Sequence, residues 1–489
     1  MILAIDAGTT GVTAVAIKAD GSKAAHGYQE FPQHFPQPGW VEHDLEEIWQ
    51  ATKSAVKQVL NQLGDTKFLG LGITNQRETI GLWDKQTLVS PTPAIVWQDR
   101  RTTQILEDLK SNPSINKVQQ LTGLPLDPYF SASKLRWYKS HKPEIWLEVT
   151  SGNLIAGTID TYLISRLTNG NSHITDASNA SRTQLYDIHK GTWSEELLEL
   201  FGIPLHALPT VVDSSGLLAT TDPESFFGLS IPISGIAGDQ QAALFGQTQF
   251  DVGGAKCTYG TGAFILQNTG ADSKVLDNGL ITTVAWQLNG TRTYASEGSV
   301  FVAGAAVQWL RDGLEIIQKS ADSETLARTV EDNGGVVFVP ALTGLGAPYW
   351  EPKATGSIFG ITRGTTNAHI TRATLEAIAF QVKDIFDAMG QTGIKLSTLR
   401  VDGGASANGL LMQLQADRLE VPLQRPTNLD STAQGAAYLA GLGVGLWGSL
   451  EELRILNPIE KTFEPKPVSP DAYARWKQAI EATIGFVGK

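Results

Sequence analysis

Apolar residues along the chain fall into short runs separated by turns rich in glycine and threonine. Residues 2–5 form the first run, residues 6–11 supply turn-forming side chains, and residues 12–17 form a second run rich in strand-forming residues. Short apolar runs bounded by such turns are typical of strands, whereas a helix needs a longer amphipathic period. The beginning of the chain therefore predicts a strand, a turn and a second strand.

The first helical period begins after Asp44. This residue can cap a helix, and Glu47 three positions later matches the pattern of a capping box. The pattern predicts a helix directly after Asp44, because apolar side chains then recur with near-helical spacing at Ile48, Trp49, Val56, Val59 and Leu60.

Similar patterns predict further elements along the chain. We expect strands at 68–74, 231–236 and 399–401, and helices at 154–167, 241–245 and 299–310.

The second half of the chain opens like the first. Residues 256–259 lead into the turn Gly260-Thr261-Gly262, and residues 263–266 form another apolar run. The repeated strand, turn and strand indicates a pseudo-duplicated fold, although turns of this kind also occur singly. A polar, glycine-bearing stretch near 246–254 separates the halves. We therefore expect an α/β protein with two domains, 1–247 and 248–489.

Composition narrows the class of protein. A chain of 489 residues is too long for a single hydrophobic core, and 42% hydrophobic with 18% charged residues is typical of a globular protein. The net charge of −12 argues against a nucleic-acid binder and against a protein held on an anionic membrane, because both need basic patches. A phosphate ligand is still acceptable, since a local cradle of backbone N–H groups can hold an anion.

The cysteine content and the first residues bear on the cellular compartment. The single cysteine, Cys257, permits no disulfide within the chain, and we interpret it as an inert thiol rather than a nucleophile. The first residues lack the basic stretch and apolar core of a signal peptide, and no apolar run reaches membrane-spanning length. Eight scattered histidines indicate no zinc cluster. A cytoplasmic protein is expected.

The two turns rich in glycine and threonine are candidate phosphate sites. Glycine lets the backbone approach a phosphate, and threonine adds a hydroxyl donor. An ordinary hairpin is the alternative for each turn. Asp6 favours a functional first turn, because a carboxylate at a strand end beside a phosphate can hold Mg²⁺ through water.

Two further glycines are candidate nucleotide contacts. Gly404 follows the predicted strand 399–401, and Asn408 lies near the start of the next helix; a strand-to-helix turn without a ligand is an equal alternative. Gly304 lies inside the predicted helix 299–310, where glycine costs about 1 kcal/mol relative to alanine. Gln308 falls on the same face. A ligand or close helix packing would each explain this glycine.

Polar residues at the ends of two predicted strands are candidates for binding a small substrate. Arg77 and Glu78 follow the strand at 68–74 and offer donors and acceptors to neighbouring hydroxyls. Trp97 is a candidate apolar wall or a core residue. Asp239 stands where a strand ends and a helix starts, which favours its ionised form; a helix N-cap is the alternative.

Several of these segments together resemble the FGGY family of carbohydrate kinases. The likeness runs from about residue 2 to about residue 447 and includes two signature regions of the family, around 129–137 and 356–376. The matching segments include PGWVEHD at 38–44, ITNQRET at 73–79, DPYFS at 127–131, ISGIAGDQQ at 233–241 and LGAPYW at 345–350.

The resemblance implies an actin-like, ribonuclease H-like fold of two domains, each a mixed five-stranded sheet with flanking helices, around a deep cleft. It implies in-line transfer of a phosphoryl group from ATP, with Mg²⁺, to a small polyol, and the matched set favours glycerol. In keeping with the net charge, we expect no nucleic-acid or membrane partner, and we expect a homodimer or homotetramer.

The resemblance also implies roles for single residues. Asp239 would receive the hydroxyl proton late in a loose transition state. The implied acceptor site consists of Arg77, Glu78, Trp97, Tyr129, Asp239, Gln240 and Phe264. The implied ATP contacts are Thr9, Thr10, Gly11, Thr261, Gly304, Gln308, Gly404 and Asn408, and the implied Mg²⁺ residues are Asp6 and Asp239.

The sequence departs from the family at two places. Thr13 stands where most glycerol-phosphorylating members carry an arginine that reaches the phosphates, and the stretch 225–230 lacks the arginine of a fructose 1,6-bisphosphate loop. Two alternatives stay open: a kinase of another polyol or sugar, and a non-catalytic, chaperone-like ATP-binding protein with the same fold.

Overall fold

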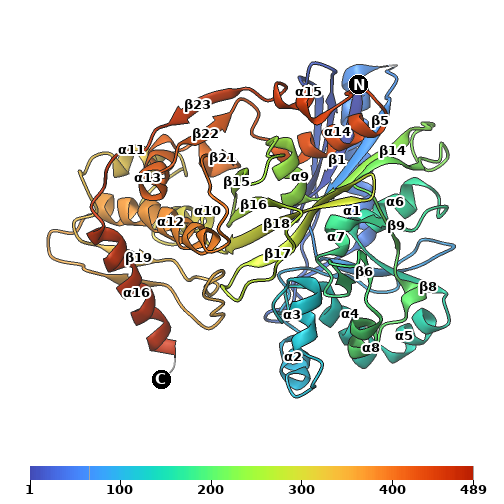
Figure 1. The fold of residues 1–489 in the computed structure, drawn as a ribbon, viewed down its shortest axis with the longest axis horizontal. Helices are drawn as coiled ribbons and strands as arrows, with labels where there is room; N and C mark the ends of the chain where they lie inside the picture. The colour runs from blue at the N-terminus through green and yellow to red at the C-terminus, as the bar shows by residue number, and fades with distance from the viewer. Residues whose placement is uncertain (65, 488–489) are drawn as a thin grey trace.

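A computed structural model describes residues 1–64 and 66–487. Two large mixed sheets with flanking helices dominate it (Figure 1). The first sheet has six strands in the order β13-β14-β5-β1-β2-β3. Their bounds are β1 Ile2–Ala7, β2 Gly11–Ile17, β3 Lys23–Glu30, β5 Gly70–Asn75, β13 Ser215–Thr220 and β14 Pro232–Gly238.

The second sheet has seven strands in the order β17-β18-β16-β15-β21-β22-β23. Their bounds are β15 Ala255–Tyr259, β16 Ala263–Gly270, β17 Ile281–Leu288, β18 Thr291–Val300, β21 Leu399–Asp402, β22 Leu423–Pro426 and β23 Ile459–Phe463.

Both sheets are built on the same pairing scheme. In the first sheet β2 is antiparallel to β1 and to β3, while β1, β5 and β14 run parallel. In the second sheet β16 is antiparallel to β15 and to β18, while β15, β21 and β22 run parallel. This repeated five-strand scheme confirms the predicted duplication. Edge strands β13, β17 and β23 raise the totals to six and seven instead of the expected five.

Two helices at the junction of the halves each pack on the other half's sheet. Helix α9 (Asp239–Gly246) contacts β15, β16 and β17 as well as β14, and α14 (Ser431–Gly443) contacts β1, β5 and β14. Figure 1 shows α14, drawn in orange-red, beside the blue strands of the first sheet. Glycines permit this approach: a Cβ on Gly72 would lie 2.2 Å from the Ala436 carbonyl oxygen. The two halves therefore share an interface, and the division at 247/248 stays a prediction.

Smaller elements surround each sheet. On the first half these are β4 Glu42–His43, β6 Ile80–Asp84, β7 Ala94–Ile95, β8 Leu154–Thr158, β9 Ile174–Asp176, β10 Tyr186–Asp187, β11 Thr192–Trp193, β12 Thr210–Val212, α1 Leu45–Leu63, α2 Thr103–Leu109, α3 Asn116–Thr122, α4 Ser131–His141, α5 Pro143–Thr150, α6 Ile159–Leu167, α7 Ala177–Ala180 and α8 Glu195–Phe201. On the second half they are α10 Gly304–Asp312, α11 Asp322–Ala327, β19 Val337–Val339, β20 Ser357–Phe359, α12 Asn367–Gly390, α13 Gly409–Leu419, α15 Leu450–Arg454 and α16 Asp471–Val487. Within the described ranges, none of the helices combines the length and the apolar character needed to cross a bilayer.

Two helices predicted from the sequence are wrong in extent. The stretch 154–167 divides into β8, which pairs with β6, and α6, because a continuous apolar run does not distinguish a buried strand from a helix. The stretch 299–310 divides into the end of β18 and α10, so Gly304 begins the helix instead of interrupting it.

The predicted start of α1 after Asp44 is confirmed, but Glu47 does not have the partner that a capping box would give it. The Asp44 carboxylate accepts a hydrogen bond from the Glu46 backbone N–H at 2.7 Å. The Glu47 carboxylate lies 2.8 Å from the His34 ring instead of completing a capping box.

Candidate active site

Three parallel strands of the first sheet carry polar residues at one edge. Asp6 lies on β1 beside Thr74 of β5, and β5 in turn pairs with β14, which ends at Gly238. Arg77 and Glu78 follow β5, and Asp239 follows β14. Because the carboxyl ends of parallel strands meet at one edge of a sheet, the fold gathers residues from three distant segments at this place.

Arg77 is the centre of this group. Its Nε lies 3.1 Å from Asp239 Oδ1, and its two η-nitrogens donate to Glu297 at 2.6 and 2.9 Å. Burial alone would lower the pKa of the guanidinium, but Glu297 and Glu78 outweigh it and raise this pKa well above its usual value. Arg77 is therefore a permanent, fully oriented cation.

Glu78 adjoins Arg77 and is buried. Its Oε1 accepts a hydrogen bond from Arg182 Nε at 2.7 Å, and its carbonyl oxygen accepts one from the Ser131 hydroxyl at 2.8 Å. Its backbone lies in the left-handed region with φ of 61°, a conformation uncommon for residues other than glycine. Burial raises the pKa of its carboxyl group despite Arg182 and Arg77. These constraints fix the direction of the side chain.

Asp239 is the first residue of α9, and Gly238 is the helix cap. The N-cap interpretation of Asp239 is therefore wrong. Its Oδ1 accepts a hydrogen bond from the Gln240 N–H at 2.6 Å and faces Arg77. The Asp239 side chain is 26% exposed, so it is accessible from solvent.

Tyr129 lies near the charged group, since Glu78 and Arg77 act on its hydroxyl, and it carries a second aromatic ring with it. Trp97 and Tyr129 meet edge to face, with ring centroids 5.4 Å apart. Trp97 Nε1 donates to the Thr9 hydroxyl at 3.0 Å, which ties this wall to the first turn. Phe264 is partly exposed on β16, opposite Ser299 of β18.

The first turn places Asp6 close to two other carboxylates. Burial, then the charges of Asp239 and Asp430, raises the pKa of Asp6 from 3.8 to about 8. Such mutual repulsion is relieved by a divalent cation, so Asp6 and Asp239 fit Mg²⁺. Across the described chain no group of three or more histidine, cysteine, aspartate or glutamate side chains forms a metal cage. A Mg²⁺ ion here would take its other ligands from water and phosphate.

The second turn is held against the start of α10. The Gly304 N–H donates to the Gly260 carbonyl at 3.0 Å, and the N–H groups of Ala303 and Ala305 donate to the Thr261 carbonyl. A Cβ on Gly304 would lie 2.4 Å from the Gly260 oxygen. Close packing therefore explains this glycine without a ligand. Gln308 is exposed on the same helix.

The turn after β21 is open to solvent at one position. Gly403 has φ of 82° and passes close to the Tyr259 backbone, whereas a Cβ on Gly404 would meet nothing within 4 Å. Asn408 caps α13 by accepting from the Leu411 N–H at 2.9 Å. The cap occupies the side-chain amide oxygen of Asn408. A nucleotide contact through Asn408 stays a prediction.

Three buried charged residues in or near the site were not predicted from the sequence. Arg182 and Glu297 contact Glu78 and Arg77, as described above. Lys256 on β15 donates to the Gln240 side chain and, at 2.9 Å, to the Thr258 hydroxyl. No local pattern indicates these residues; the only signal is a charged residue within or beside an otherwise small or apolar stretch.

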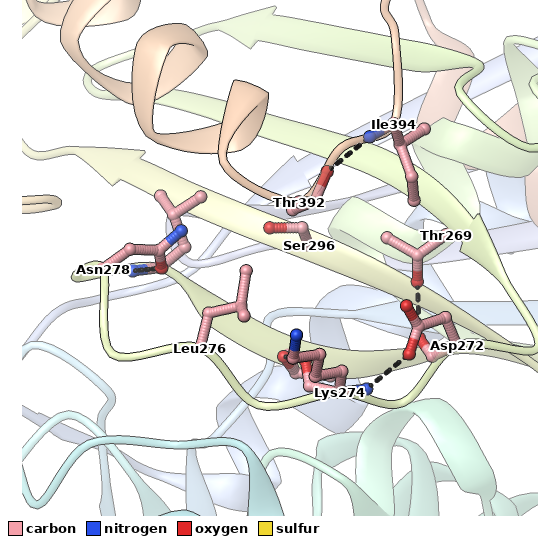
Figure 2. A pocket seen from close by; sticks show the side chains of 10 residues that line it. Thr269, Asp272, Lys274, Leu276, Asn278, Ser296, Thr392 and Ile394 are labelled. Atoms are coloured by element: carbon pink, nitrogen blue, oxygen red, sulfur yellow. Dashed lines mark hydrogen bonds between the residues drawn. The ribbon is translucent and has the colours of Figure 1, made fainter.

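A small pocket elsewhere contains none of the predicted site residues. It lies beside β16, β17 and β18 and the segment after α12. Figure 2 shows its polar groups bonded to one another: Thr269 donates to the Asp272 carbonyl, and the Lys274 N–H donates to the Asp272 carboxylate. Its volume of about 20 Å³ leaves room for about one water molecule. The pocket therefore does not coincide with the group around Arg77.

Two family domains match almost the whole chain. The N-terminal domain of the FGGY family of carbohydrate kinases matches residues 1–246, and its C-terminal domain matches residues 255–444. This chain belongs to the FGGY family of carbohydrate kinases. The family confirms the resemblance and the predicted α/β fold with two related halves.

Named relatives are similar in sequence to this FGGY kinase over nearly their full length. A glycerol kinase of Carboxydothermus hydrogenoformans is 49% identical, covering 98% of this chain and 97% of that one. A glycerol kinase of Limosilactobacillus reuteri is 49% identical, covering 100% and 99%. The structure of Plasmodium falciparum glycerol kinase with ADP superposes with a TM-score of 0.92 at 36% identity, covering 99% and 98%. A gluconate kinase from Lactobacillus acidophilus, at 23% identity and a TM-score of 0.87, shares the fold.

Proposed function

We propose that this FGGY kinase transfers the γ-phosphoryl group of ATP to glycerol, giving sn-glycerol 3-phosphate and ADP, in glycerol uptake and catabolism. The observation that carries the proposal is the gathering of Arg77, Glu78 and Asp239 at one sheet edge, beside the Trp97–Tyr129 wall. The relatives named glycerol kinase support the choice of acceptor.

Glycerol would lie between the charged residues and the aromatic wall. The carboxylate of Glu78 accepts from one or two hydroxyls, Arg77 donates to one, and Trp97, Tyr129 and Phe264 cover the carbon chain. Gln240 lies next to Asp239. An acceptor that lacks a hydroxyl would leave these buried polar groups unpaired, which discriminates strongly against it.

Asp239 is the proposed acceptor of the hydroxyl proton. Its Oδ1 is engaged by Gln240 and Arg77, so Oδ2 is the oxygen left for the substrate. In a loose phosphoryl-transfer transition state little charge develops on the attacking oxygen, so positioning matters more than basicity.

The ATP side is proposed to use both turns and the second half. Thr9, Thr10, Gly11 and Thr261 would donate to the phosphates, and Gly304, Gln308, Gly404 and Asn408 would border the nucleotide. Asp6 and Asp239 would hold Mg²⁺, which supplies positive charge to the phosphates when bound. A homodimer or homotetramer in the cytoplasm completes the proposal.

An ADP-release assay with ATP and single acceptors tests the function. We expect the highest kcat/KM with glycerol among glycerol, erythritol, xylulose, ribulose and gluconate. A higher value for any of the others would assign the enzyme to that acceptor. ATP hydrolysis of equal rate with and without a polyol would favour the non-catalytic, shape-changing alternative.

Asp239→Asn tests the role of the carboxylate. The variant keeps the shape of the side chain and should still bind glycerol, while kcat falls by roughly 10²- to 10⁴-fold because the proton acceptor is lost. Glycerol binding is checked by calorimetry. An unchanged kcat would remove Asp239 from this role.

A further inference from the structure

Four charged side chains from three separate segments form one buried network. Arg77 and Glu78 belong to the acceptor site, Arg182 follows α7, and Glu297 lies on β18 of the second sheet. Each of the four side chains is 2% exposed or less. The two cations and two anions balance, which is what burial of charges requires.

Glu297 is the member that joins the others. Its two oxygens accept hydrogen bonds from both η-nitrogens of Arg77, at 2.6 and 2.9 Å, and Oε1 also accepts from Arg182 at 3.1 Å. Arg182 uses its Nε to donate to Glu78 at 2.7 Å. One carboxylate of the second half thereby orients two arginines of the first half.

A count of hydrogen bonds shows which donors of Arg77 and acceptors of Glu78 stay available to a substrate. Arginine has five N–H donors. In Arg77, Nη1 donates to Glu297 and Gln241, Nη2 donates once to Glu297, and Nε faces Asp239. One N–H of Nη2 remains. Within residues 1–64 and 66–487, no protein donor reaches Glu78 Oε2, since the bond from Arg182 falls on Oε1.

We propose that Glu297 and Arg182 are positioning residues for the phosphoryl acceptor: they direct the single free N–H of Arg77 and the free Oε2 of Glu78 at the hydroxyls of the polyol. The proposal rests on the proposed function. It assigns part of the selection of the acceptor to a residue of the second half, although the groups that touch the acceptor lie mainly on the first.

The charge state of the network supports this assignment. Burial would raise the pKa of Glu297, but Arg182 and Arg77 outweigh it and hold this pKa at about 2. Glu297 therefore stays ionised through the working range of pH. A neutral replacement would leave the two buried guanidinium groups with Glu78 and the partly exposed Asp239 as their remaining carboxylate neighbours, and it would release Arg77 from its bidentate partner.

Glu297→Gln and Arg182→Lys test the proposal, with Glu376→Gln as the matched control. Glu376 is also a buried glutamate paired with an arginine, Arg372, at 2.9 Å, and it accepts from Asn333 at 2.8 Å. It has no place in the proposed site. The same chemical change at this position therefore reports the effect of losing a buried ion pair alone.

Kinetic constants are measured with glycerol and with propane-1,2-diol, which lacks one hydroxyl. We expect both network variants to lower kcat/KM for glycerol by roughly 10- to 100-fold, the range for a lost charged hydrogen bond. The KM for ATP should change less than threefold, and the preference for glycerol over propane-1,2-diol should shrink. Glu376→Gln should leave the preference and both KM values unchanged.

Three outcomes would overturn the proposal. They are an unchanged preference between the two acceptors in both variants, equal changes in the KM values for ATP and glycerol, and the same kinetic changes in Glu376→Gln. Circular dichroism shows whether Glu297→Gln folds. If it does not, Arg182→Lys and the charge-retaining Glu297→Asp are judged by the same kinetic criteria. The kcat/KM of Glu297→Asp for glycerol is expected between those of wild type and Arg182→Lys.

The wild-type acceptor preference is measured first, and it separates the two proposals. Wild-type enzyme that prefers another polyol contradicts the proposed function alone. The network variants are then compared on the preferred polyol and on its analogue with one hydroxyl removed. A loss of preference there would still support the positioning role, and a retained preference would still refute it.

Discussion

Asp6→Asn should make the metal-free protein more stable while removing its activity. Burial, with Asp239 and Asp430, raises the pKa of the Asp6 carboxyl from 3.8 to about 8. Between these values the folded protein keeps a proton on Asp6 that the unfolded chain has lost, so stability falls as pH rises through this window. Asparagine carries no charge and avoids this loss.

The gain in stability follows from the pH range between the two pKa values of Asp6. At about 1.36 kcal/mol per pH unit, the advantage of asparagine grows by about 4 kcal/mol from pH 5 to pH 8. Asp6 is only partly buried by its exposed area, and solvent screening reduces this to about 2 kcal/mol. For unfolding of one half or of the whole chain, that corresponds to about 2–4 °C in Tm.

Thermal unfolding in EDTA at pH 5 and pH 8 measures this effect. The Tm advantage of Asp6→Asn over wild type should be larger at pH 8 than at pH 5. Asp251→Asn, at a carboxylate that is 76% exposed, should match wild type at both. A variant advantage that does not grow with pH would refute the electrostatic reasoning.

Addition of Mg²⁺ and ATP should reverse the order of stability. Ligands that bind only the folded state raise its stability by mass action. Wild type should gain several degrees, whereas Asp6→Asn should gain little because it has lost a proposed Mg²⁺ ligand. Equal gains in both proteins would exclude Asp6 from the Mg²⁺ site.

Two further predictions concern the turns. Gly304→Ala places a Cβ 2.4 Å from the Gly260 oxygen. It should lower the free energy of unfolding by about 1–3 kcal/mol and raise the KM for ATP. In the control Gly390→Ala the Cβ meets nothing within 4 Å, so Tm and KM should stay unchanged. Thr13→Arg restores the family arginine directly opposite Asp6 on β2 and should lower the KM for ATP by roughly 3- to 10-fold, the effect of one charge-assisted phosphate contact. Initial rates at varied ATP measure both, and an unchanged KM in Thr13→Arg would show that the arginine is dispensable here.

Elements with a strong local signal could be predicted from the sequence. The hairpins at Gly8 and Gly260 follow from short apolar runs around glycine-bearing turns, and the start of α1 follows from Asp44. The stretch 154–167 could not be divided, because its first residues pair with β6, which lies about seventy residues earlier in the sequence. Local pattern contains no information about such a partner.

The same limit applies to the site. Arg77, Glu78 and Asp239 stand at strand ends, where a sequence pattern can find them. Arg182 and Glu297 cannot be found in this way, since they are 104 and 220 residues away from the residues they orient. The sequence singles out Gly304 through the cost of glycine within a helix, whereas the structure explains it by close packing against the Gly260 carbonyl of another segment.

The duplicated fold explains why acceptor and nucleotide are expected on different halves. Strands β5 and β21 occupy equivalent places, each parallel to the first strand of its sheet. After β5 the chain continues with Gln76-Arg77-Glu78, whereas after β21 it continues with Gly403-Gly404. Charged side chains at the first edge suit hydroxyl groups, and bare backbone at the second suits the close approach of a nucleotide.

Glu297 is the exception to this division of acceptor and nucleotide residues between the halves, because it belongs to the second half and contacts the acceptor site. Because it reaches from β18 to Arg77, the orientation of the acceptor site depends on the relative position of the two sheets. Any movement between the halves that lengthens the Glu297–Arg77 contact would also free Arg77 from its fixed direction. We therefore expect acceptor binding to depend on the relative position of the two halves, because the Glu297–Arg77 contact joins one residue of each half.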